Sequence, residues 1–182
     1  MYIPIILGTA RKGNRSDSAA DFILKEALNY GLESEIINVK DYLMGATQEY
    51  EESEKIKALS EKIEKADGLI VVSPEYNHGY PGELKLLLDN FYTEYAKKPV
   101  GLCGVSKGAL GGARVVEQLR LVFIEFRMTP IKEAIYFSFV QDLFDGQGNI
   151  KDAALYSKKI SKFMEELLWY AKVLKKGREE NK

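Results

Sequence analysis

The chain has 182 residues, of which 46% are hydrophobic and 29% charged, and its net charge is −1. These values describe an ordinary globular protein that is long enough to bury a substantial core. The near-neutral charge gives no electrostatic reason to expect binding to nucleic acid or to an anionic membrane.

The first third of the chain alternates apolar runs with helical patterns. We predict a strand over residues 2–7, a helix over about 15–30 that Gly31 ends, and a second strand over 33–39. Residues 40–52 have no clear period, and we interpret them as a surface loop in preference to a lid. Ser53 is expected to cap a helix that runs to Ala66.

The central stretch contains an apolar run, a turn and a helical pattern. Residues 69–72 show no alternation, which indicates a parallel strand buried on both faces. Pro74 cannot continue a central strand because it has no N–H to donate, so a loop follows over residues 74–82. Apolar residues then recur at helical spacing from Leu84 to Tyr95, which predicts a helix. Tyr92 and Tyr95 should widen its apolar surface beyond what one sheet face covers, which favours a second subunit here too.

The second half continues the alternation. It predicts strands over 99–105 and 131–139, a glycine-rich loop over 106–112 and a turn-rich loop over 144–149. The helix predicted over 113–127 is apolar nearly all round, so one side should meet the sheet and the other a second subunit. Asp152 is expected to cap a last helix.

Five strands alternating with five helices predict the α/β class: a three-layer αβα sandwich around a parallel sheet. Right-handed crossovers favour the flavodoxin-like strand order 2-1-3-4-5, whose switch point lies between strands one and three. Loops 8–16 and 74–82 should meet there, where such sheets bind ligands. We expect one domain over residues 1–175, followed by a frayed tail over 176–182.

The loop from Gly8 to Ser16 joins a strand to a helix N-terminus, where amide groups and the helix dipole attract anions. Cationic and hydroxyl side chains suit a phosphate dianion, and they are Thr9, Arg11, Lys12, Arg15, Ser16 and Ser18. The glycines have P-loop spacing, but Asn14 and Arg15 stand where that motif needs Lys and Ser or Thr.

Residues 104–108 match the G-x-S-x-G nucleophile elbow of serine hydrolases. No histidine follows Ser106, and four residues separate the serine loop from the predicted helix, so a hydrolase is the least favoured alternative. His78 is the only histidine, which makes a metal site unexpected, and we interpret it as an exposed loop residue. The one cysteine, Cys103, excludes an intramolecular disulfide, and the N-terminus lacks a signal-like segment, so we expect a cytoplasmic protein.

Three motifs resemble the NAD(P)H-dependent FMN reductase family, which includes quinone, azo-dye and chromate reductases. The first is the G-T-x-R…S pattern that starts at Gly8, and the second is residues 74–82 with Leu84, Lys85 and Asp89. The third comprises Ser106, Gly108, Gly111 and Gly112, continued by Arg114 and by Gln118-Leu119-Arg120. The resemblance spans residues 8 to about 130 in the family's order.

This resemblance implies an FMN-binding, flavodoxin-like oxidoreductase that uses NADPH or NADH. It would work by ping-pong hydride transfer to quinone, free flavin or azo-type acceptors, with no catalytic protein nucleophile. The implied cofactor-binding residues are Thr9, Arg11, Arg15, Ser16, Ser18, Pro74, Glu75, Tyr76, Asn77, His78, Gly79, Ser106, Gly108 and Gly111. The backbone of residues 77–79 would bond the flavin ring, and family members commonly form dimers or dimers of dimers.

Within the 74–82 loop, Glu75 could act as a general acid, but a structural role is favoured for a carboxylate at a helix start. A non-enzymatic electron carrier is the second alternative for the whole chain. Arginines in place of an uncharged, hydroxyl-rich phosphate loop argue against it, as does the near-neutral charge.

Overall fold

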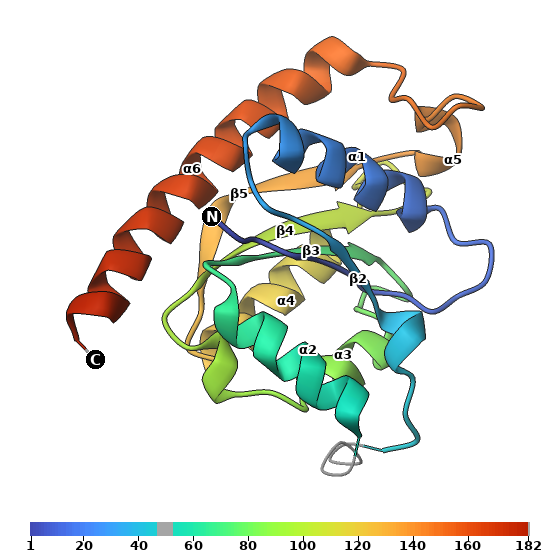
Figure 1. Cartoon of the computed structure of the whole chain (residues 1–182). Coiled ribbons are helices and arrows are strands. Elements are labelled where there is room, and N and C mark those ends of the chain that lie inside the picture. The colour runs from blue at the N-terminus through green and yellow to red at the C-terminus, as the bar shows by residue number, and fades with distance from the viewer. Residues whose placement is uncertain (47–52, 182) are drawn as a thin grey trace.

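The computed structural model describes residues 1–46 and 53–181. Its strands form one parallel sheet in the order β2-β1-β3-β4-β5, seen almost edge-on between two layers of helices in Figure 1. The strands are β1 (Ile5–Leu7), β2 (Ile36–Asn38), β3 (Leu69–Pro74), β4 (Pro99–Val105) and β5 (Thr129–Phe137). The order, the parallel pairing and the αβα layering confirm the predicted fold class.

Helices cover both faces of the sheet (Figure 1). Helices α1 (Ser16–Asn29) and α6 (Ala153–Glu180) pack on one face, and α2 (Glu54–Lys65), α3 (Gly82–Leu88) and α4 (Ala113–Glu125) pack on the other. The described residues also form three short elements: η1 (Val39–Tyr42), η2 (Thr93–Tyr95) and α5 (Val140–Leu143).

The strands divide their side chains between two separate cores. In β3, Leu69 and Val71 pack toward α2, α3 and α4, whereas Ile70 and Val72 pack toward α1 and α6. All four side chains are fully buried, as the apolar run without alternation predicted. Cys103 lies in the second core, where burial raises the pKa of its thiol and leaves it unreactive.

Several predicted boundaries move by a few residues. The first two strands are shorter than expected, with residues 2 and 33 forming an isolated bridge, and the fifth begins at Thr129. The Ser53 and Asp152 caps are confirmed, because their side chains accept from the amides of Ile56 and Leu155. The long loop predicted over 40–52 starts inside η1, and its residues 47–52 lie outside the described residues.

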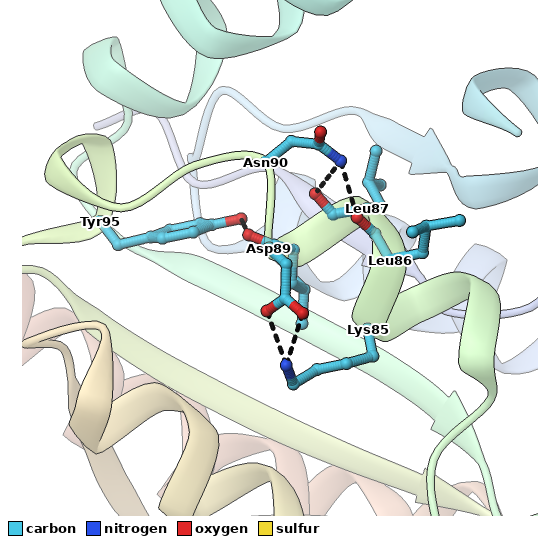
Figure 2. A network of polar contacts seen from close by, with 7 residues as sticks. Lys85, Leu86, Leu87, Asp89, Asn90 and Tyr95 are labelled. Atoms are coloured by element: carbon cyan, nitrogen blue, oxygen red, sulfur yellow. Dashed lines mark hydrogen bonds and ion pairs between the residues drawn. The ribbon is translucent and has the colours of Figure 1, made fainter. Parts of the chain in front are cut away.

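The helix predicted to reach Tyr95 ends at Leu88 instead, and Figure 2 shows why. The side-chain amide of Asn90 turns back and donates to the carbonyl of Leu86 at 2.6 Å, while the Tyr95 hydroxyl donates to that of Leu88 at 3.3 Å. These bonds satisfy carbonyl groups that a helix end leaves open. Lys85 and Asp89, which the resemblance included, form an ion pair at 2.5 Å beside this end.

The early end of α3 changes the role expected for Tyr95. We expected this ring to widen an exposed apolar surface, but it is fully buried and stacks on Phe126 with 4.9 Å between ring centroids. Tyr92 does remain partly exposed, with its ring edge-on to Phe126.

The tail expected to fray is helical, because α6 continues to Glu180. Arg178 donates to the backbone carbonyl of Lys97 at 2.6 Å, and Lys175 pairs with the buried Asp67 at 3.0 Å. These contacts fasten the last turns of α6 to the loops at the amino end of the sheet. Among the described residues, no helix combines the length and apolar character needed to cross a bilayer.

Candidate functional site

Three loops leave the carboxyl edge of the sheet side by side. The hydrogen-bond ladder continues just past the strands: Gly8 N donates to Val72 O at 2.8 Å, and Glu75 N donates to Val105 O at 3.0 Å. Ser106 N extends it to Phe137 O at 3.1 Å. The loops after β1, β3 and β4 are therefore held in register at the predicted switch point.

These loops enclose a cleft of about 470 Å³, a volume within the usual range for small-molecule sites. Its lining comes from all three loops and from the start of α5. The lining residues are Arg11, Lys12, Gly13, Asn14, Arg15, Ser16, Pro74, Glu75, Tyr76, Val105, Ser106, Lys107 and Val140.

The first loop is anchored by the carboxylate of Glu83 on α3. This carboxylate accepts from Ala10 N at 3.0 Å and from the Thr9 hydroxyl at 3.2 Å. Thr9 is buried, and its Oγ1 also accepts from Arg11 N at 3.2 Å. The guanidinium of Arg11 lies 5.7 Å from the centroid of the Tyr76 ring, which belongs to the second loop.

Two of the helix amides that we expected to attract phosphate already have an acceptor. The side-chain oxygen of Asn14 takes hydrogen bonds from Ser16 N at 2.8 Å and from Asp17 N at 3.0 Å, which caps α1. An anion in this cleft would therefore depend more on the charged side chains than on the amides at the start of α1.

Four of the lining side chains are cationic: Arg11, Lys12, Arg15 and Lys107. Within residues 1–46 and 53–181, none of the four forms an ion pair. In a chain with a net charge of −1, this is a local excess of positive charge suited to a phosphate group.

The second loop forms a tight hairpin turn at residues 76–79. Tyr76 and Gly79 exchange both backbone hydrogen bonds, at 2.9 and 3.0 Å. Asn77 and His78 between them have φ values of +50° and +70°, as a type I′ turn requires. In the described part of the chain, the amides of Asn77 and His78 have no acceptor, so these are the donors that the turn can offer to a ligand.

Gly79 differs from our expectation. Its N–H and C=O are both used inside the turn, so the amides available for a flat ligand are those of Asn77 and His78. Its φ is not positive, and the absence of a side chain has another reason. A Cβ there would lie 3.2 Å from the side-chain oxygen of Gln118 on α4.

Glu75 has the structural role that was favoured for it. It acts on α4, however, and not on α3, the helix that follows it in the chain. One carboxylate oxygen accepts from Arg114 N at 3.1 Å, near the start of α4, and the other accepts from the guanidinium of Arg114 at 2.9 Å. The Glu75 side chain is only 9% exposed. It neutralises Arg114 and caps α4.

The third loop lacks the geometry of a nucleophile elbow. Ser106 is not in the strained, positive-φ conformation of such a serine, and its hydroxyl exchanges hydrogen bonds with Gly108 N and O at 3.1 and 3.2 Å. Helix α4 starts at Ala113, well past the serine. The only histidine lies in the second loop, and the Ser106 hydroxyl donates to Gly108 O instead of to a histidine.

Three glycines of this region serve packing. A Cβ on Gly111 would lie 2.8 Å from the Ser138 hydroxyl, and one on Gly112 would lie 2.6 Å from Val105 N. A Cβ on Gly104 would lie 2.6 Å from Gly112 O. The family resemblance implies that the glycines of the 106–112 loop let a flat ring approach the backbone closely, but at Gly111 and Gly112 the close neighbour is the protein itself.

The cleft thus collects half of the expected cofactor-binding residues: Arg11, Arg15, Ser16, Pro74, Glu75, Tyr76 and Ser106. The others lie outside its lining, namely Thr9, Ser18, Asn77, His78, Gly79, Gly108 and Gly111. Val140 was not expected at the site, and it reaches the cleft because Val140 N donates to Ser106 O at 3.1 Å. No sequence pattern marks that contact, since it depends on how the chain turns after β5.

The fold and the position of the cleft place this chain among the flavodoxin-like proteins. The FerB flavoenzyme NAD(P)H:(acceptor) oxidoreductase of Paracoccus denitrificans superimposes with a TM-score of 0.80 at 20% identity, covering 94% of this chain and 97% of that one. A flavodoxin of Pseudomonas aeruginosa gives a TM-score of 0.59 at 17% identity, over 92% and 99% of the two chains.

Sequence similarity identifies the family. The model of the NADPH-dependent FMN reductase family matches residues 1–142, so the chain belongs to that family, as its motifs predicted. A quinone reductase of Escherichia coli is 33% identical over 156 residues, which cover 81% of this chain and 82% of that protein. An NAD(P)H-dependent FMN reductase of Schizosaccharomyces pombe is 42% identical over 84 residues, but these span only 41% of its length.

Family membership confirms the expectation of an oxidoreductase enzyme, which was favoured over the alternative of a non-enzymatic electron carrier. FMN and NAD(P)H are the cofactor and co-substrate of this family.

Proposed function

We propose that this protein is an FMN-dependent NAD(P)H oxidoreductase that reduces quinones, free flavin or azo-type compounds by a ping-pong sequence. The observation that supports this most is the shared cleft, in which cations of the first and third loops, without ion pairs among the described residues, lie beside the Tyr76 turn. A quinone reductase and an FMN-dependent NADPH-azoreductase among the relatives support the choice of acceptors.

The residues present fit FMN. Arg11, Lys12 and Arg15 would hold its phosphate, with Ser16 at the base of that loop. The amides of Asn77 and His78, which have no acceptor in the described part of the chain, would face the ring. Bound FMN would supply the redox chemistry by accepting hydride from NAD(P)H and passing it to an acceptor that takes the place of the nucleotide.

The protein itself would bind and orient. The Glu75 carboxylate is occupied by Arg114, and the Ser106 hydroxyl by Gly108, so neither is poised as an acid or a nucleophile. Tyr76 and Pro74 would form one wall of the ring site, and Val105 and Val140 would add apolar surface. The chemistry then needs positioning and donor groups rather than a catalytic side chain.

The test combines a spectrum with kinetics. The purified protein, or the protein mixed with FMN, should show the absorption of bound oxidised flavin, and it should oxidise NAD(P)H only when a quinone or another acceptor is added. Parallel lines in double-reciprocal plots would support the ping-pong order. A Ser106→Ala variant should keep full reductase activity, and loss of activity with flavin still bound would contradict the proposed division of roles.

We also propose a homodimer, or a dimer of dimers, formed through α4. Leu121 and Ile124 are one helical turn apart on α4 and are 71% and 60% exposed. Tyr92, 47% exposed, packs edge-on against Phe126 just after the same helix. Apolar side chains grouped in this way are typical of subunit interfaces. The cytoplasmic location and the single domain over residues 1–175 remain predictions.

A further inference from the structure

Helix α4 contacts the second loop at two points, one helical turn apart. Arg114 holds Glu75 at the start of the loop, and Gln118 donates from its side-chain nitrogen to the carbonyl of His78 at 2.9 Å. Residues four apart lie on the same face of a helix, so both side chains point toward the loop. Gln118 belongs to the third sequence motif, but its side chain does not line the cleft, and the proposed function gives it no role.

Both polar groups of the peptide between His78 and Gly79 are held by hydrogen bonds. Its carbonyl accepts from Gln118, and its N–H, which belongs to Gly79, donates to Tyr76 O at 3.0 Å. The preceding peptide, between Asn77 and His78, has no such bonds among the described residues. The turn is therefore anchored at its last peptide and offers its donors from the two positions before it.

Gly79 leaves the space that the Gln118 side chain occupies. With the Gln118 nitrogen facing the His78 carbonyl, its oxygen lies over the Cα of Gly79, where a Cβ would come within 3.2 Å. The side-chain amide thus lies against the turn, and the missing Cβ leaves room for it. The turn also needs external support, because both of its central residues have positive φ without being glycine.

We propose that Gln118 is a positioning residue for the flavin ring: it holds the His78–Gly79 peptide so that the Asn77 and His78 amides point at the ring. This inference rests on the proposed function, in which FMN occupies the cleft. Without the Gln118 bond, the His78–Gly79 peptide could rotate, and the ring would lose preorganised donors.

The test compares three substitutions at one position by titrating the flavin-free protein with FMN and with riboflavin, read by flavin fluorescence. Gln118→Leu removes the donor, and Gln118→Glu replaces the donor with an oxygen of the same size. Both should weaken FMN and riboflavin by the same factor, about tenfold, because the ring is common to the two ligands. Gln118→Lys restores a donor and should recover most of the affinity. Glu125→Gln, an exposed residue on the same helix, is the control.

Thermal unfolding of the flavin-free variants distinguishes positioning from a general loss of stability. The inference predicts small and similar changes in Tm for the Leu and Lys variants, with different flavin affinities. Unchanged flavin affinity in Gln118→Leu would overturn it, as would a loss that affects FMN but not riboflavin, or a loss that Lys fails to restore. If the unaltered protein bound neither FMN nor riboflavin, the proposed function itself would be refuted. Failure of the proposed function and failure of the Gln118 inference therefore give different results.

Discussion

The Oγ1 of Thr9 and the hydroxyl of Tyr76 lie 3.0 Å apart and form a hydrogen bond between the first loop and the second. The two residues follow β1 and β3, the strands on either side of the switch point. Together with the Arg11 guanidinium over the Tyr76 ring, this bond makes the two loops one unit. The phosphate end and the ring end of the proposed flavin site are therefore set relative to each other before a ligand arrives.

Arg11→Ala should weaken FMN by roughly 1.5–3 kcal/mol, the value of a hydrogen bond to a charged group. Riboflavin has no phosphate and should bind the variant almost as well as the unaltered protein. Titration of the flavin-free protein with each ligand measures the difference, with Lys162→Ala, an exposed cation on α6, as the control. Equal weakening of both ligands would place Arg11 elsewhere than at the phosphate.

In the 76–79 turn, the stability lost on substitution should depend on the backbone φ of each position and not on whether the position holds glycine. Asn77→Val places a β-branched residue at φ +50° and should destabilise the protein by roughly 1–2 kcal/mol. Asn77→Gly should be tolerated, and Gly79→Ala should cost less than Asn77→Val, because Gln118 can move slightly. Denaturant unfolding of the flavin-free proteins checks the order, and a Gly79→Ala variant less stable than Asn77→Val would refute it.

The proposed interface on α4 predicts a change of mass. Leu121→Lys should convert the dimer to a monomer at micromolar concentration, because a charge would be buried without a partner. Leu155→Lys, at an exposed apolar position on α6, should leave the mass unchanged. Light scattering coupled to size exclusion measures both. A monomeric mass for the unaltered protein would rule out the interface.

Lys98 predicts a pH dependence of stability. It is buried and donates to the carbonyls of Ile63 and Glu64 at the end of α2, and burial lowers its pKa to about 8. Between about pH 8 and 10 the unfolded chain holds a proton on this lysine that the folded chain lacks. The free energy of unfolding should therefore rise with pH in this window, by roughly 1–3 kcal/mol.

Denaturant unfolding across the window tests this dependence. Lys98→Met should flatten the rise, whereas Lys25→Met, an exposed residue on α1, should leave it intact. The quantity to compare is the slope of the free energy of unfolding against pH. The absolute value is less informative, because Lys98→Met also loses two hydrogen bonds. An unchanged slope in Lys98→Met would show that another group titrates.

The sheet order was predictable because it depends on features that a sequence displays directly. The apolar run of residues 69–72 marked the buried central strand, and Pro74 marked its end. The three glycine- or proline-containing loops then had to meet at one edge of a parallel sheet. Short-range caps such as Ser53 were equally visible.

What could not be predicted depends on contacts between distant segments. Apolar spacing continued through Tyr95, but Asn90 ends α3 with its own side chain, and the Tyr95 ring belongs to the core beside Phe126. The tail is held by Asp67, which is more than a hundred residues away. In the site, Glu75 meets Arg114 and Gly79 meets Gln118, and only the packing of α4 on the second loop reveals these pairings.

The contact between Gly104 and Gly112 has a consequence for protein engineering. Each glycine faces the backbone of the other with no room for a methyl group, and Gly112 also has a φ of +85°. Strand β4 and the start of α4 therefore cannot be altered here one residue at a time without strain. A library meant to change the range of acceptors should keep these two positions and Gly111 constant and vary Lys107, Ala109 and Leu110, whose side chains are exposed.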